Sequence, residues 1–195
     1  MTQFAAIILA GGQSSRMGKD KAFIEIDGVP LLQKICIIAS ECTSQVYVIT
    51  PSPQKYRAII PQNCQIVQEV VLEGENTSHG PLVGFAQALT HVESEWILLL
   101  ACDLPRLTSS EIKQWSSCLE TTSQDAIALL PHSPKGWEPL CGFYRRRCLS
   151  LLNNFINRGG RSFQQWLASH FVQELLVSDS KILLNCNTPD DLRQI

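Results

Sequence analysis

Short, continuous apolar runs alternate with longer amphipathic segments along most of the chain. The apolar runs are rich in Ile, Val and Leu and do not alternate with polar residues, which is typical of parallel strands that helices cover on both faces. The candidate strands are residues 4–10, 45–50, 65–69, 96–102 and 125–130. Between them, apolar residues recur at helical spacing, which predicts helices at residues 30–42, 53–60, 81–92, 109–120, 146–156 and 162–171.

This alternation predicts an α/β fold of three layers, a doubly wound, Rossmann-like arrangement around a mostly parallel sheet. The alternation of apolar runs and amphipathic segments ends after Pro131. We expect residues 132–147 and 172–192 to form a small accessory β region and a final helix. No internal repeat, low-complexity tract or long linker interrupts the pattern. Residues 1–195 are therefore expected to form a single domain.

The charge balance narrows the classes of partner. The chain has 16 Lys and Arg residues against 18 Asp and Glu residues, for a net charge of -2. Such a balance gives no general attraction to nucleic acid or to an anionic membrane, so any anion binding has to be local. The longest apolar run, residues 96–102, is far shorter than a membrane-spanning helix, and no secretory leader is recognised. A cytoplasmic location is expected.

The eight cysteines include no pair at CxxC spacing. Cys36 and Cys42 fall in a helical pattern, whereas Cys102 and Cys186 fall in apolar runs that read as strands. Buried, reduced thiols are the favoured interpretation. A thiol-based redox or metal-binding protein remains an alternative that depends on the cysteine count alone.

The segment after the first predicted strand carries the strongest functional signal, because ligands bind beyond the carboxyl ends of the strands in such sheets. Residues 10–22 read AGGQSSRMGKDKA. Gly11 and Gly12 let backbone N–H groups approach an anion, and Arg16 and Lys21 add positive charge, as a polyphosphate-binding loop requires. The segment matches neither the Walker loop nor the GxGxxG fingerprint. A flexible, glycine-rich surface turn is the alternative.

The ordered pattern LAGGQSSRMGKDKAFIEIDGVPLL, residues 9–32, resembles the signature of nucleotidyltransferases that attach NMP groups to phosphorylated acceptors. The LAGG form, followed by RMG and DKA, is most similar to the molybdenum cofactor guanylyltransferase family. The resemblance continues in HGPLVGF (79–85), CDLP (102–105), EPL (138–140) and NCNTPDDL (185–192), and so spans nearly the whole chain.

The resemblance implies transfer of GMP from GTP to the terminal phosphate of molybdopterin, with release of pyrophosphate. Asp103 ends a predicted strand, so its carboxylate should reach the same edge as the glycine-rich segment, where a hard oxygen ligand suits Mg²⁺. An aspartate that caps the helix near Thr108 is the alternative. The resemblance implies catalytic roles for Arg16, Lys21 and Asp103, and nucleotide contacts for Leu9, Ala10, Gly11, Gly12, Lys21, Glu69 and Asp103.

Glu69 is the candidate for reading the base, because a carboxylate accepts from both N1–H and the N2 amine of guanine. The family usually has Asp near this position, and a solvated glutamate at a strand end remains an alternative. Pro51 stands where the family often has an asparagine that helps to hold the nucleotide. The residues expected to bind the acceptor are Arg158, Arg161, Asn185 and Asn187.

The three consecutive arginines and the histidines are expected to have no part in catalysis. Arg145, Arg146 and Arg147 should lie mainly on a solvated face, and no histidine is given a catalytic role. Two alternatives of function stay open: a cytidylyltransferase that acts on the same pterin, whose signature usually reads LAAG, and a non-catalytic nucleotide-binding protein of the same fold. The expected partners are GTP and molybdopterin, with transient contacts to molybdoenzymes or cofactor-delivery proteins, and neither nucleic acid nor membrane.

Overall fold

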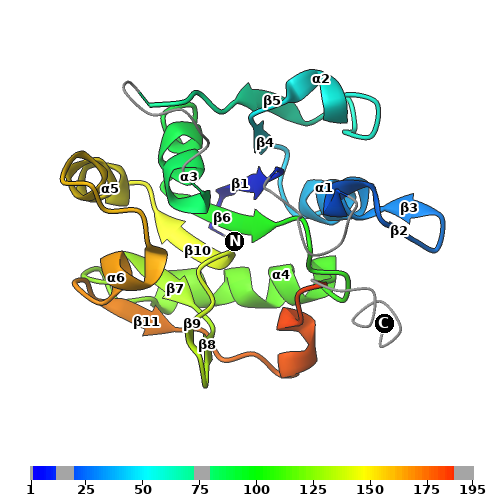
Figure 1. The fold of residues 1–195 in the computed structure, drawn as a ribbon. Coiled ribbons are helices and arrows are strands. Elements are labelled where there is room, and N and C mark those ends of the chain that lie inside the picture. Colours follow the sequence, from blue (N-terminus) through cyan, green and yellow to red (C-terminus); the bar gives the residue numbers. More distant parts are fainter. Residues whose placement is uncertain (1, 12–19, 73–79, 187–195) are drawn as a thin grey trace.

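The computed structural model describes residues 2–11, 20–72 and 80–186, and these residues form a seven-stranded sheet with helices on both faces (Figure 1). The strand order is β11-β7-β10-β6-β1-β4-β5. The strands of the sheet are β1 (Phe4–Leu9), β4 (Val46–Thr50), β5 (Gln65–Gln68), β6 (Trp96–Ala101), β7 (Ala128–Leu130), β10 (Cys141–Arg145) and β11 (Val172–Glu174).

The helices are α1 (Leu31–Ser40), α2 (Pro53–Tyr56), α3 (Pro81–Leu89), α4 (Ser109–Ser117), α5 (Cys148–Asn157) and α6 (Phe163–Leu167). Three short 3-10 turns are η1 (Lys21–Phe23), η2 (Cys118–Thr121) and η3 (Ser180–Leu183). Two hairpins stand apart from the main sheet, β2 (Glu25–Ile26) with β3 (Val29–Pro30), and β8 (His132–Ser133) with β9 (Gly136–Trp137). None of the described helices is long and apolar enough to cross a membrane.

The order of the strands fixes where the chain reverses direction across the sheet. From β1 the chain adds β4 and then β5 on one side, and it returns to place β6 on the other side of β1. Both neighbours run parallel to β1, with Leu9 paired to Ile49 of β4 and to Ala101 of β6. The carboxyl ends of β1 and β6 therefore form a topological switch point, the place where doubly wound sheets bind ligands.

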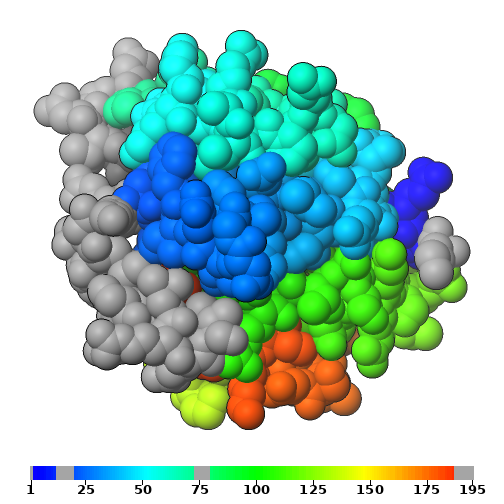
Figure 2. All heavy atoms as spheres, turned by 90° about the vertical axis from the view of Figure 1, so that its right-hand side faces the viewer, coloured from blue at the N-terminus to red at the C-terminus, as the bar shows by residue number. Residues whose placement is uncertain are grey.

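Alternate residues of each strand face two separate cores, as the pleat of a strand requires. Ala6 and Ile8 of β1 pack with α1 and α4, whereas Ala5 and Ile7 pack with α3, α5 and α6. In the space-filling view, α4, α1 with the β2–β3 hairpin, and the region around α2 lie one above another on one face (Figure 2). The three-layer, mostly parallel α/β arrangement expected from the sequence is confirmed.

The region after Pro131 differs from the expected accessory β region. The small hairpin β8–β9 is present, but residues 141–145 form β10, which inserts between β6 and β7 and runs antiparallel to both. Residues 172–174 form the edge strand β11, parallel to β7. Cys186 follows η3 rather than lying in a strand. The expected final helix lies outside the described residues.

Of the three consecutive arginines 145–147, Arg147 is exposed and Arg146 is partly exposed, whereas Arg145 departs from the expected solvated face. Arg145 is buried, pairs with Glu95 and lies 4.2 Å from the centre of the Trp96 ring. The side chains of Arg146 and Arg147 donate to backbone carbonyl oxygens of loops at the amino edge of the sheet, those of Val92, Gln124 and Ala126. These hydrogen bonds therefore hold the loops at the amino edge of the sheet, which is opposite the switch point.

Candidate active site

The glycine-rich segment leaves β1 at the switch point, and Gly11 shows why it needs a glycine. Its φ is +134°, and a Cβ atom built there would lie 2.8 Å from Cδ of Pro51. A side chain is excluded both by the backbone conformation and by this close approach. The side chain of Pro51 thus packs against the start of the loop. Pro51 stands where the resembling family often has an asparagine. Gly12 and Arg16 lie outside the described residues.

Lys21 and Asp103 meet at the carboxyl edge, 82 residues apart in sequence. The Nζ atom of Lys21 lies 3.0 Å from Oδ2 of Asp103, and the two side chains are 21% and 15% exposed. The other carboxylate oxygen of Asp103, Oδ1, is buried and has no hydrogen-bond partner among the described residues. The structure thus brings together the two predicted residues that bear opposite charges.

The helix-cap alternative for Asp103 does not fit the structure. Thr108 is the N-cap of α4, and its side chain accepts a hydrogen bond from the backbone N–H of Glu111 at 3.3 Å. Because a helix start needs one such side chain at the N-cap position, Asp103 is not required there. The carboxylate of Asp103 is left facing Lys21.

Asp20 anchors the segment that carries Lys21. One carboxylate oxygen accepts from the backbone N–H of Ala22 at 3.1 Å, and the other accepts from Oη of Tyr56 at 2.6 Å and lies 2.5 Å from Nζ of Lys55. Burial raises the pKa of Asp20, but the hydrogen bonds from Lys55, Tyr56 and Ala22 outweigh it and leave the pKa lowered. The ring of Phe23 stacks on Tyr56 at 5.5 Å. The end of the loop is therefore fixed to α2.

Glu69 leaves the edge strand β5 and lies against α3. Its backbone N–H donates to the carbonyl oxygen of Thr50 at 2.8 Å, and its carboxylate lies beside Gly84, where a Cβ atom would be 3.7 Å from Oε2. The same Cβ position is 3.8 Å from the side chain of Leu9. Gln87 of α3 accepts from the N–H of the next residue, Val70, and donates to its carbonyl oxygen. The structure thus places Leu9, Glu69 and the first turns of α3 together.

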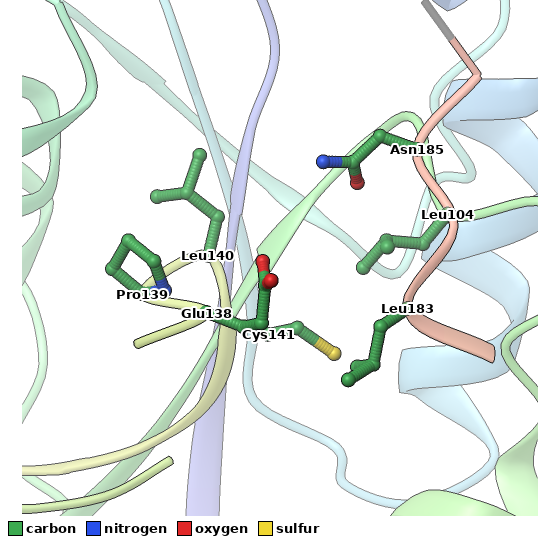
Figure 3. A pocket seen from close by; sticks show the side chains of 7 residues that line it. All are labelled: Leu104, Glu138, Pro139, Leu140, Cys141, Leu183 and Asn185. Atoms are coloured by element: carbon green, nitrogen blue, oxygen red, sulfur yellow. The ribbon is translucent and has the colours of Figure 1, made fainter. Parts of the chain in front are cut away.

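A pocket of about 110 Å³ lies beside Leu104, the residue that follows Asp103 (Figure 3). It is lined by Leu104, Glu138, Pro139, Leu140, Cys141, Leu183 and Asn185. The backbone N–H of Cys186 donates to the carbonyl oxygen of Asp103 at 2.9 Å, which holds the C-terminal segment beside the edge. Asn185, predicted to bind the acceptor, is therefore next to Asp103, whereas Asn187 lies outside the described residues. No role was predicted for Glu138, although it belongs to the EPL motif.

The two arginines predicted to bind the acceptor do not line this pocket. Nη1 of Arg161 donates to the carbonyl oxygens of Ile156 and Gly160 at 2.8 and 2.7 Å, so this side chain closes the end of α5. Arg158 is the exposed C-cap residue of the same helix. Their role toward the acceptor stays a prediction.

None of the eight cysteines, all of which lie in the described residues, forms a disulfide, and five of them are buried. Burial raises the pKa of Cys102 to about 12, with further contributions from Asp103 and Asp20, so this thiol stays neutral beside the site. Within the described part of the chain, no group of three or more His, Cys, Asp or Glu residues is placed to hold a metal ion. The redox or metal-binding alternative therefore still depends on the cysteine count alone.

A glycine-led loop and a Lys–Asp pair at the switch point of a doubly wound sheet are the features expected of an α/β nucleotidyltransferase. The family described as "MobA-like NTP transferase domain" matches residues 6–174. The chain belongs to this family.

Relatives and solved structures agree with this assignment. A "Probable molybdenum cofactor guanylyltransferase" of Nostoc sp. is 54% identical over 100% of this chain and 91% of the relative. A "Molybdenum cofactor guanylyltransferase" of Syntrophotalea carbinolica is 30% identical over 97% of this chain and 89% of the relative. The structure of molybdopterin-guanine dinucleotide biosynthesis protein A from Archaeoglobus fulgidus superposes with a TM-score of 0.78 at 21% identity, covering 97% of this chain and 95% of that one, and shares the fold.

Proposed function

We propose that this protein transfers the GMP group of GTP to the terminal phosphate of molybdopterin and releases pyrophosphate. The observation that carries the proposal is the Lys21–Asp103 pair at the switch point, next to the loop that begins at Gly11. The names of the full-length relatives support both the nucleotide and the acceptor.

The donor set at Asp103 fits a divalent cation. Nucleotidyltransferases generally use a divalent metal, and we propose Mg²⁺, which favours one or two carboxylates together with substrate phosphates. The buried oxygen Oδ1 of Asp103 has no hydrogen-bond partner among the described residues, so it is available as a hard ligand. Mg²⁺ bound there would polarise the α-phosphoryl group.

The chain itself supplies position and positive charge. The acceptor phosphate is already an anionic nucleophile, so the reaction needs alignment and charge neutralisation rather than a base. Lys21 would turn from Asp103 to the triphosphate, and Arg16 is expected to offset charge on the leaving pyrophosphate. The backbone of residues 9–12 would hold the nucleotide, that is Leu9, Ala10, Gly11 and Gly12.

Glu69 is proposed to select guanine. Its carboxylate lies beside Gly84, where the missing side chain leaves room next to the charge. Two acceptor oxygens match the N1–H and N2 donors of guanine, whereas cytosine and adenine cannot offer this pair of donors. A transient contact with molybdoenzymes and a cytoplasmic location remain predictions.

The test compares nucleotides with molybdopterin as the acceptor. Mg²⁺-dependent release of pyrophosphate should require GTP and be weak with CTP or ATP. Equal rates with GTP and CTP would refute the guanylyl assignment and favour the cytidylyl alternative. Nucleotide binding without any pyrophosphate release would favour the non-catalytic alternative.

A further inference from the structure

Glu138 places a charge in a pocket that is otherwise mostly apolar. The residue is half-buried, and its side chain extends between Leu140 on one side and Leu104 and Leu183 on the other (Figure 3). Its carboxylate has no hydrogen-bond or ion-pair partner among the described residues. Glu138 is not among the residues with buried, unpartnered side-chain oxygens, so its carboxylate is open to solvent and the N–H donors of a ligand can reach it.

Two backbone contacts and a neighbouring thiol show that this position is fixed. The N–H of Glu138 donates to the carbonyl oxygen of Pro131 at 2.9 Å, and the N–H of Cys141 donates to the carbonyl oxygen of Glu138 at 3.3 Å. Burial and then the charge of Glu138 raise the pKa of the Cys141 thiol, so the carboxylate stands close to this buried sulfur. The charge is therefore held at the pocket by the turn that begins β10.

The shape and chemistry of the pocket suit the edge of a flat heterocycle. A volume of about 110 Å³ is somewhat smaller than the roughly 150 Å³ cavity that holds benzene, so it takes one ring and leaves the rest of a ligand outside. Apolar walls suit the faces of a ring, and two carboxylate oxygens accept two parallel N–H donors. The 2-amino-4-oxopyrimidine edge presents such a pair of donors, and both guanine and pterin carry it.

The strand order decides between these two rings. Glu69 follows β5, on one side of Asp103, and Glu138 precedes β10, on the other side. Lys21 and Asp103 lie between them, where the phosphates of donor and acceptor have to meet. If Glu69 takes guanine, the carboxylate on the far side is left for the acceptor.

We propose that Glu138 recognises the 2-amino-4-oxopyrimidine edge of the acceptor's pterin ring, with Asn185 beside it. This inference rests on the proposed transfer of GMP to molybdopterin. The two substrates, which share one hydrogen-bonding edge, are then held by two separate carboxylates on opposite sides of the reacting phosphates.

The test is Glu138→Gln, which keeps the shape but replaces one acceptor oxygen by a donor. We expect the KM for molybdopterin to rise about tenfold or more, because two donors lose their charged partner. The KM for GTP and the kcat at saturating acceptor should stay within about twofold. Glu174→Gln, a change at an exposed glutamate of β11, is the matched control and should leave all three values unchanged.

A binding arm separates this inference from the proposed function. The wild type should bind 2-amino-4-oxopteridine at least about tenfold more tightly than 2,4-dioxopteridine, whose 2-oxo group opposes the carboxylate, and Glu138→Gln should abolish most of that preference. An unchanged acceptor KM and an unchanged pteridine preference would overturn the inference while GMP transfer stands. A raised KM for GTP in Glu138→Gln would also overturn the inference, because it would assign the pocket to guanine instead of pterin. Failure of wild-type GMP transfer would refute the proposed function, and the pteridine measurements would still test Glu138.

Discussion

Replacing Asp103 by Asn tests the centre of the proposed site, because it keeps the shape of the side chain and removes its charge. The Lys21–Asp103 pair is only 21% and 15% exposed, so its contribution lies between that of exposed pairs and fully buried ones. We expect a loss of about 1–2 kcal/mol in unfolding free energy. Part of this loss is offset because the neutral amide of Asn costs less free energy than a charged carboxylate when it is buried without a hydrogen-bond partner. A domain stable by about 5–15 kcal/mol stays folded.

The effect on catalysis should be much larger. Removing a carboxylate that helps to hold Mg²⁺ on the reacting phosphates is expected to cost about 3–4 kcal/mol in the transition state, or about 10²–10³-fold in rate. GTP binding without metal should stay the same or tighten, because a negative charge no longer faces the triphosphate. The contrast between a small loss of stability and a large loss of rate distinguishes a metal ligand from a structural ion pair.

The assay is a Mg²⁺ titration of GMP transfer, followed through pyrophosphate release, together with thermal unfolding. Asp125→Asn, at an exposed aspartate between η2 and β7, serves as the control and should behave like the wild type. A variant that keeps both the normal rate and the normal Mg²⁺ dependence would show that Asp103 serves only to pair with Lys21. The metal site would then have to lie elsewhere.

Three further predictions follow from the contacts around the loop. Lys21→Ala should weaken the nucleotide or transition-state interaction by about 1.5–3 kcal/mol, measured as kcat/KM for GTP, and an unchanged value would contradict a phosphate-binding role. Gly11→Ala should lower Tm and GTP affinity, because the left-handed backbone and the 2.8 Å approach to Pro51 exclude a methyl group; a wild-type Tm would show that the loop relaxes. The pKa of Asp20 is lowered in the fold, so the carboxyl stabilises the protein above its ordinary pKa of 3.8, and this stability is lost as the pH falls through the folded value. Asp20→Asn should therefore have a lower Tm than the wild type at pH 7 and a smaller difference from it near pH 3, and a constant difference would contradict the ion pair with Lys55.

Much of the fold could be predicted because its parallel strands are continuous apolar runs. Residues 4–10 and 96–102 contain β1 and β6 almost to the residue, and the rule that ligands bind at the carboxyl ends of strands then pointed to Lys21 and Asp103. Asp20 was not predicted to have a role, because its partners Lys55 and Tyr56 lie in α2, far from it along the chain. A single sequence does not reveal such a long-range contact.

Residues 141–145 were expected in an accessory β region, but the sequence of β10 does not show that this strand lies inside the main sheet. It reads CGFYR, with a glycine and an arginine that both argue against a central strand. The contacts around β10 explain how the sheet accommodates both residues. A Cβ atom at Gly142 would lie 2.8 Å from the carbonyl oxygen of Leu129, so the close approach of β7 needs a glycine. Arg145 is buried only because Glu95 neutralises it and the ring of Trp96 covers it.

The direction of β10 also explains why Glu138 escaped the search for a site. In a parallel sheet the segments that follow strands reach the ligand-binding edge, so the sequence points to those segments as candidates. Because β10 runs antiparallel to β6, with Cys141 opposite Leu100, the segment that precedes it reaches the edge instead. The inserted strand therefore brings Glu138 beside Leu104 and Asn185, and these residues line a pocket next to the segment that carries Asp103. If Glu138 binds the acceptor as proposed, this one reversed strand supplies a place for the second substrate that a purely parallel sheet would lack.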